Sequence, residues 1–473
     1  MAYNLTDRQQ PMLLPSIIDD YVSAEDPVRA YDAFVDALNF QELGLPLLPR
    51  GNADEYYPKA MLKLFIYGYA YGIRSSRKLE RACQHNLSFI WLMGGLKPDY
   101  RTIARFRQQH KEVLKKVLKQ CVRLCMKFGL IEGNALFIDG SAMRADASIK
   151  HTWDIKRCER HIQQLNERID RLVDEKETED SDAEQEENLV KLKEQLRNKE
   201  QLKKAVEEFT QETQRKSLNT IDPDSVNTKG RQGAHAGYKA QITADGKHGL
   251  IVNSDALSQN SDSNELPGQI QGAQENLGKK PQTVCADSGY YSPETLSKVD
   301  KDITLVVPSH ETMRVERGGE LNPFNKEQFT YNRDTDTYTC PAGKLLHYST
   351  NKEEGRIYQA QPQDCHSCIH FGVCTKRQRK GRAIIRMNRE ALQQNLKAVY
   401  KSAAGQAIYK LRQQTVELIF GHFKRNQSAG QFLLRGRQGT NAELSVLSTC
   451  FNITRMITLM GGVSRLIFKL NNT

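Results

Sequence analysis

The sequence of 473 residues has no long apolar segment and no apolar stretch at its N-terminus. No segment approaches the roughly 18 to 20 consecutive apolar residues that a membrane-spanning helix needs, so we expect no membrane-spanning helix. The first ten residues, MAYNLTDRQQ, lack the short apolar core of a secretory signal. Ten cysteines in a chain without such a signal are typical of a reducing cytosol. We therefore expect a cytoplasmic protein.

Acidic residues are scarcer than basic ones, with 57 Asp and Glu against 68 Lys and Arg. The net charge of +11 favours a polyanionic partner or membrane headgroups and does not separate the two. Hydrophobic residues make up 38% of the chain, enough for a sizeable core. The length predicts two or three domains.

The acidic residues are unevenly distributed: one block, residues 174–187, carries nine acids and one lysine. Such blocks usually stay solvated and disordered, so we interpret it as a tip or linker; the alternative is a decoy that competes with a polyanion. Apolar residues spaced by three and four on both sides predict two amphipathic helices that form an antiparallel hairpin over residues 151–217. This hairpin is either a structural arm or an arm that dimerises or grips DNA.

Residues 1–130 read as mainly helical, with helical segments at 77–94 and 99–129. The segment that begins at residue 101 is basic and suits a phosphate backbone, although a solvated helix face has the same composition. Its candidate DNA contacts are Arg101, Arg105 and Arg107.

The middle of the chain changes from helices to short apolar strands. Two of them, Ala135 to Ile138 and Thr283 to Ala286, end on Asp139 and Asp287. Further strands are predicted at 236–243, 249–254 and 303–307, and a helix at 263–277. Strands in a row followed by alternating strands and helices indicate an α/β fold with a mixed sheet covered by helices. One long helix is then predicted at 403–426 and an apolar one at 441–460.

Three carboxylates stand in structured, partly apolar contexts: Asp139, Asp287 and Glu417. A carboxylate in such a place costs solvation free energy unless it is paired or bound to a metal. Three converging carboxylates suit Mg²⁺, and two such ions support phosphodiester chemistry. Taken singly, each aspartate is more often a turn or helix-cap residue.

Four of the ten cysteines, Cys340, Cys365, Cys368 and Cys374, lie close together in the sequence. They form either a structural Zn²⁺ site or a set of reduced thiols without metal. Directly after them, residues 375–389 carry seven basic residues and no acid. This run is either a solvated segment or a contact with DNA phosphates, and we favour the contact.

Five stretches together resemble bacterial insertion-sequence DDE transposases. FIDGSAMRADAS (137–148), ADSGYYSPETL (286–296) and VELIFGHFKRNQSAGQFLLRG (416–436) resemble the three catalytic blocks of that family. GYKAQITAD (237–245) resembles its second strand, and PDYRTIARFR (98–107) resembles the end of its helical N-terminal domain. The resemblance covers nearly the whole chain, in the expected order.

The resemblance implies an RNase H-like catalytic domain over residues 131–460, after a helical N-terminal DNA-binding domain (1–130) and before a C-terminal tail (461–473). It makes the helical arm at 151–217 and the Cys-rich segment at 311–400 insertions in that domain. The catalytic, metal-binding acids are then Asp139, Asp287 and Glu417. The family's Tyr, Arg, Glu, Lys signature falls on Tyr409, Arg412, Glu417 and Lys424.

This sequence departs from the signature at one point. Arg412 lies five residues before Glu417, whereas the family places it four before, where this chain has Gln413. The seven residues from Glu417 to Lys424 keep both on one helix face, so that Lys424 can reach a phosphate beside the acids. Arg435 and Arg437 are further candidate phosphate contacts.

The resemblance also implies a mechanism and partners. Two Mg²⁺ or Mn²⁺ ions would support hydrolysis at a transposon end, and the freed 3′-hydroxyl would then attack target DNA. The partners would be double-stranded DNA, as terminal inverted repeats and as target, and further copies of the chain in a dimer or higher oligomer, with no membrane partner. The expected location is the nucleoid. Two rivals remain: a transposon-derived repressor that has lost catalysis, and a related nuclease that cuts without joining.

Overall fold

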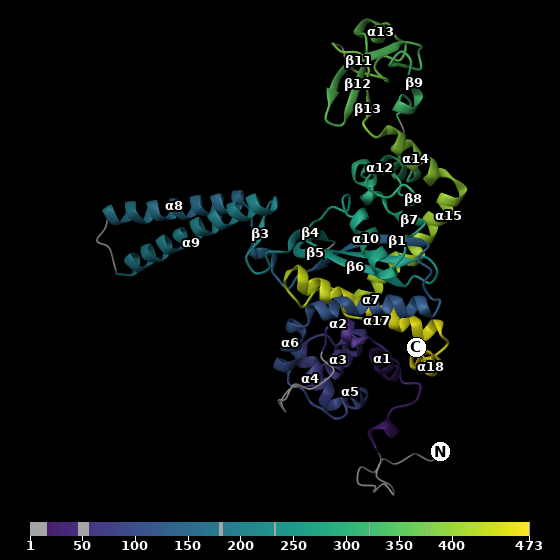
Figure 1. The fold of residues 1–473 in the computed structure, drawn as a ribbon. Helices are drawn as coiled ribbons and strands as arrows, with labels where there is room; N and C mark the ends of the chain where they lie inside the picture. The colour runs from purple at the N-terminus through teal and green to yellow at the C-terminus, as the bar shows by residue number, and fades with distance from the viewer. Residues whose placement is uncertain are drawn as a thin grey trace, which may run out of the picture. The chain divides into compact units, whose positions relative to one another are not determined.

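The computed structural model describes residues 17–45, 56–178, 183–230, 233–320, 322–377 and 379–472. It divides into two compact units. Unit 1 comprises residues 1–261, 268–281 and 413–473, and unit 2 comprises residues 262–267 and 282–412. Helices and strands are labelled in Figure 1.

Unit 1 begins with a helical region, as the sequence predicts. Its elements are η1 (Ile18–Tyr21), α1 (Pro27–Asp36), α2 (Phe40–Leu43), α3 (Pro58–Ala70), α4 (Ser76–His85), α5 (Leu87–Leu92), α6 (Tyr100–Gln109) and α7 (Lys111–Lys127). Each segment that we predicted as continuous is interrupted once. Asn86 caps α5 through its side chain, and His110 separates α6 from α7. Asparagine side chains compete with the helix for backbone amides, which explains the first interruption.

The strands of unit 1 form an antiparallel sheet in the order β4–β5–β1, with β6 paired to β5. The strands of this sheet are β1 (Ala135–Arg144), β4 (Val226–Gly230), β5 (Gly233–Asp245) and β6 (Ile251–Leu257). The small elements nearby are η2 (Ile149–His151), β2 (Thr152–Trp153) and β3 (Leu218–Asn219), and the helix after β6 is α10 (Leu266–Leu277). Figure 1 shows α7 and α17 (Gly436–Leu459) lying along this sheet, and both helices contact β6.

Two asparagines of α17 bind the backbone of β6. Asn452 accepts a hydrogen bond from the Ile251 amide at 2.8 Å and donates one to the Ile251 carbonyl at 2.8 Å. Asn441 accepts one from the Ala256 amide at 2.6 Å. Buried backbone groups need partners, so these side chains hold the helix against the strand. Most of α17 is buried, including polar residues.

Between β2 and β3, unit 1 carries the predicted helical hairpin. Its helices are α8 (Ile155–Thr178) and α9 (Ala183–Thr213), which lie antiparallel in Figure 1. At its base the Trp153 ring lies between two cations, Arg157 at 4.2 Å and Lys199 at 3.8 Å from the ring centroid. Helix α8 extends into the acidic block as far as Thr178 and α9 begins in it at Ala183, so these two parts of the block are helical where we predicted disorder. Residues 179–182 of that block lie outside the described residues.

The end of unit 1 is helical: a π-helical turn η5 (Gln413–Glu417), then α16 (Leu418–Arg425), α17 and α18 (Val463–Asn471). We predicted a tail at 461–473, but Val463, Leu466 and Leu470 of α18 are buried and the helix contacts α1. In the part of the chain that the structure describes, no single helix is long and apolar enough to cross a membrane. Among the described helices, α17 and α18 reach that length and apolar composition when they are counted together, but the chain bends by 107° between them.

Unit 2 pairs β7 (Thr283–Ala286) with β8 (Thr304–Val306) in parallel. Its helices are η3 (Ser288–Tyr290), α11 (Pro293–Leu296), α12 (His310–Glu316), η4 (Lys326–Gln328), α13 (Pro362–His366), α14 (Glu390–Lys401) and α15 (Ala403–Arg412). Parallel and antiparallel pairs together, with helices, confirm a mixed α/β architecture.

The Cys-rich segment of unit 2 forms its own antiparallel sheet, in the order β13–β12–β11–β10–β9. Its strands are β9 (Thr330–Asn332), β10 (Thr337–Thr339), β11 (Leu345–Lys352), β12 (Gly355–Ala360) and β13 (Ala383–Met387). Phe329, Tyr338, Leu346, Tyr358 and Ile384 are its buried centre. The sequence predicted an insertion here without predicting this sheet.

Candidate functional site

Asp139 lies in the middle of β1, and the prediction that the strand ends there was wrong. The strand continues to Arg144, with Asp139 opposite Ile242 of β5 and Arg144 opposite Gly237. Gly140 and Ser141 resemble turn residues in the sequence, yet the buried strand β5 supplies their backbone partners. Side chains two apart share one face of a strand, so Asp139 and Ser141 face the same side.

Glu417 closes the π-helical turn η5, which contacts both β1 and β5. Val416 and Ile419 are fully buried, while Glu417 is exposed. Seven residues further along, the Lys424 ammonium donates a hydrogen bond to the Ser141 hydroxyl at 3.3 Å. Unit 1 therefore brings the helical segment of Glu417 and Lys424 beside the strand that carries Asp139.

A π-helical turn lies at the point where the spacing of this chain departs from the signature of the family that it resembles. A π-helix makes i→i+5 hydrogen bonds and is typically an α-helix with one inserted residue, often at a functional site. The extra residue between Arg412 and Glu417 falls in this turn, Gln413–Glu417. The long helix predicted at 403–426 is consequently three segments, α15, η5 and α16.

Asp287 follows β7 in unit 2 and accepts a hydrogen bond from the Gly289 amide at 2.8 Å, which makes it the cap of η3. Helix α15 packs on β7. On this helix the Arg412 guanidinium lies 5.6 Å from the centre of the Tyr409 ring. Burial raises the pKa of Tyr409, the Arg412 charge opposes that rise, and the Asp287 carboxylate adds to it. Asp287, Tyr409 and Arg412 thus form one cluster within unit 2.

The three predicted acids are divided between the two units: Asp139 and Glu417 in unit 1, Asp287 in unit 2. Their joint geometry stays a prediction. Their carboxylate oxygens are the ligand type that Mg²⁺ prefers. Within the described residues, no group of three or more His, Cys, Asp or Glu side chains is arranged to hold a metal ion.

The structure gives the predicted DNA-contact residues different environments. Arg101 and Arg105 are exposed on α6, and Arg101 lies over the Tyr100 ring at 5.7 Å. Arg107 instead points inward and donates to the Tyr69 hydroxyl at 3.3 Å. Near the end of the chain, Arg435 pairs with Asp146 at 3.1 Å and Arg437 with Asp255 at 3.3 Å. Four of these five side chains, all but Arg105, therefore have a partner among the described residues.

A buried ion pair that the sequence analysis missed links three parts of unit 1. Arg74 and Glu443 lie 2.6 Å apart with side chains 4% and 0% exposed. Arg74 also donates to the carbonyls of Ser428 and Gln431, and Glu443 accepts from two backbone amides of the same loop. Gln431 in turn forms an isolated β-bridge with Arg144, the last residue of β1. A lone acid in the apolar run of α17 was the available sequence signal.

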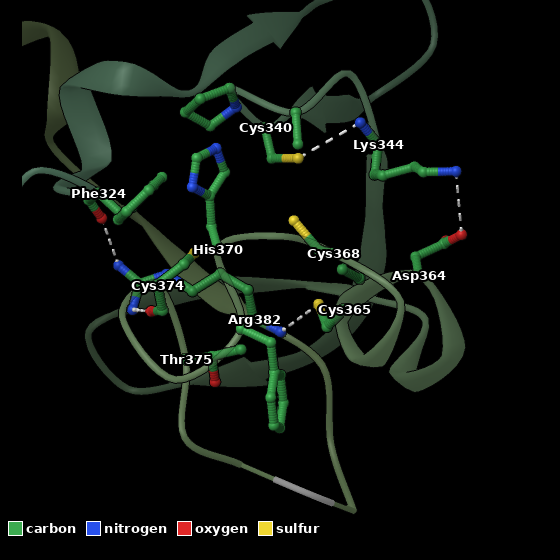
Figure 2. Close-up of a pocket in the computed structure, with 14 residues that line it drawn as sticks. Phe324, Cys340, Lys344, Asp364, Cys365, Cys368, His370, Cys374, Thr375 and Arg382 are labelled. Carbon is green, nitrogen blue, oxygen red and sulfur yellow. Dashed lines mark hydrogen bonds and ion pairs between the residues drawn. The ribbon is translucent and has the colours of Figure 1, made fainter.

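The four candidate zinc ligands line one cavity of about 30 Å³ in unit 2 (Figure 2). Backbone amides donate to two of the sulfurs: Lys344 to Cys340 and Arg382 to Cys365, both at 3.3 Å. Burial raises the pKa of the Cys374 thiol, Arg382 opposes this rise, and the other three cysteines add to it. The four thiols line the same cavity, but among the described residues they are not grouped so as to hold a metal ion, and the predicted zinc site is therefore not supported.

Two comparisons with protein families agree with this arrangement. Residues 16–109 match the model of a transposase domain (DUF772), and residues 339–457 match a transposase DDE domain. The second match includes Glu417 and Lys424 and leaves Asp139 and Asp287 outside it. No curated protein matches the chain.

Together these matches indicate the class, because two separate stretches of the chain match transposase domains. The DDE match next to a transposase-type N-terminal region indicates, more narrowly, an insertion-sequence DDE transposase. The transposase matches imply DNA binding, and a polyanion was one of the two kinds of partner that the net charge of +11 allowed.

Proposed function

We propose that this transposase cleaves DNA at transposon ends and joins the freed ends to target DNA, as in cut-and-paste transposition. The observation that carries the proposal is the contact of η5 and α16 with β1, which brings the helical segment of Glu417 and Lys424 beside the strand that contains Asp139, in a chain that matches a DDE domain. The core would be RNase H-like, with Asp287 as its third acid.

Asp139, Asp287 and Glu417 would hold two divalent ions, Mg²⁺ or Mn²⁺. Their oxygens fit these ions, because hard cations bind carboxylates and Asp287 uses only part of its acceptor capacity in capping η3. When bound, the ions would activate the attacking oxygen and stabilise the leaving one.

The other residues would position the DNA. Lys424 is exposed and its ammonium reaches the face of β1 that carries Asp139, so it can hold a phosphate of the scissile strand. Arg412 and Tyr409 would act on the Asp287 side, where the ring orients the guanidinium. Arg101 and Arg105 on α6 would contact DNA outside the cleavage site. The active form would be a dimer or higher oligomer on DNA.

A strand-transfer assay separates this proposal from its rivals. The substrate is a linear duplex that carries the DNA flanking the gene, mixed with a supercoiled target plasmid in Mg²⁺ or Mn²⁺. The proposal predicts both nicked ends and joined product. Nicking without joining would favour a nuclease, and binding without either product would favour a repressor.

A further inference from the structure

The turn that carries the last three cysteines, residues 365–377 and here called the cysteine loop, is built rigidly from within. The Phe371 amide donates to the Cys368 carbonyl and the Cys374 amide to the His370 carbonyl, both at 2.9 Å. Arg382 donates to the Cys374 carbonyl at 3.2 Å. Figure 2 shows the side chains of Cys368, His370, Cys374 and Arg382 gathered at one pocket. The loop therefore has a defined shape.

Two aliphatic side chains on the outside of this loop are exposed to solvent. Ile369 is 90% exposed and Val373 is 63% exposed, while their neighbours Cys368, His370 and Cys374 line the pocket inside. Ile369 is the most exposed large apolar residue among those that the structure describes. Single exposed apolar residues are ordinary, but two on one rigid tip beside a basic run are a candidate contact surface.

The residues that follow this apolar tip are cationic. Lys376, Arg377, Arg379 and Lys380 are exposed, and none of them belongs to an ion pair in the described part of the chain. From Cys365 to Arg389 the sequence contains seven Lys and Arg and no acid. A surface with this charge complements a polyanion.

We propose that the cysteine loop is a DNA-deforming wedge: Ile369 and Val373 enter the minor groove of duplex DNA while Lys376 and Arg377 bind the flanking phosphates. Minor-groove proteins commonly insert aliphatic side chains at a base step and bend the duplex, and neighbouring cations neutralise its backbone. The proposal rests on the function proposed above, since it assigns a further DNA contact to the same protein.

The test uses the full-length protein and a 30-bp duplex of arbitrary sequence with a fluorophore at each end. Binding is measured by anisotropy from low to moderate salt, and bending by energy transfer between the fluorophores. Ile369→Ser with Val373→Ser should weaken binding about tenfold and abolish the bending, because groove contact and kinking are lost. Lys376→Gln with Arg377→Gln should reduce the slope of log K against log salt by about 1.8, for two phosphates.

Two matched controls lie away from the loop. Val190→Ser removes an aliphatic side chain that is 65% exposed on α9, and Lys352→Gln removes an exposed cation beside Glu353 and Glu354. Neither should change the affinity, the salt slope or the bend. All four variants should unfold at the temperature of the wild type, because the changed side chains are exposed.

The proposal is overturned if the loop variants bind and bend DNA as the wild type does. It is also overturned if they lose binding to vesicles containing phosphatidylserine and keep DNA binding, since the loop would then serve a membrane. Wild-type cleavage of end DNA is measured in parallel. Its absence would contradict the proposed function, whereas the wedge is judged by binding and bending alone.

Discussion

At the scale of single residues, the most informative contact is that of Lys424 with Ser141. It links α16, the helix that follows Glu417, to the strand of Asp139, with 3.3 Å between the Lys424 ammonium and the Ser141 hydroxyl. Spacing in the sequence predicted that Lys424 shares a face with Glu417, but no pattern identified Ser141 as its neighbour. The contact between this lysine and this serine depends on how distant segments of the chain pack together, and local periodicity in the sequence does not predict such packing.

Removing this ammonium should impair catalysis more than folding. Lys424→Ala should lower the rate of end cleavage about tenfold to a hundredfold, since a hydrogen bond to a charged group contributes about 1.5 to 3 kcal/mol. Lys424→Arg should retain part of the rate. Single-turnover cleavage measures both, with Arg425→Gln, an exposed neighbour on α16, as the matched control. Equal rates for Lys424→Ala and the wild type would remove this residue from the site.

The ion pair of Arg74 and Glu443 should act on stability. Glu443→Gln leaves the buried Arg74 charge without its partner, so the free energy of unfolding should fall by about 3 to 5 kcal/mol. The double change Arg74→Met with Glu443→Leu should recover much of that loss, because no uncompensated charge remains. Denaturant titration of the three proteins tests this expectation. A single variant as stable as the wild type would show that the pair contributes little.

At the scale of elements, helices and strands were predictable where periodicity is clear, and their ends were not. The apolar run Ala135 to Ile138 marked β1, but its continuation to Arg144 depends on β5 as partner. The helix at 403–426 was predicted without its π-helical turn, although the unusual spacing of Arg412 and Glu417 already indicated an extra residue. Strand β4 was missed, because its polar sequence VNTKG is stabilised by pairing with β5.

The cysteine cluster is the element whose chemistry is easiest to measure. If the four thiols bind structural zinc, elemental analysis should find about one zinc per chain, and Cys365→Ser with Cys368→Ser should lose it. Serine at Cys158, a buried cysteine at the base of the helical arm, is a control that should keep the metal. Unchanged zinc content in the double variant, or no zinc in the wild type, would leave the cluster as reduced thiols.

At the scale of the whole molecule, the sequence predicted the order of parts better than their form. The helical start, the mixed α/β architecture and the arm at 151–217 agree with the structure. The segment 311–400 was predicted only as an insertion, because short strands with exposed faces give weak alternation; it has its own sheet and centre. The charge was informative only when it was counted segment by segment, because the total of +11 includes one block that contains nine acids.

The three carboxylates are the central claim, and their removal tests it most directly. Asp139→Asn, Asp287→Asn and Glu417→Gln keep size and remove one charge each. Each should still bind DNA but lower Mg²⁺- or Mn²⁺-dependent cleavage of an end-containing duplex by roughly a thousandfold, since loss of a metal ligand removes several kcal/mol of transition-state stabilisation. Cleavage by any of these three variants at the wild-type rate would contradict the assignment of that acid to the site.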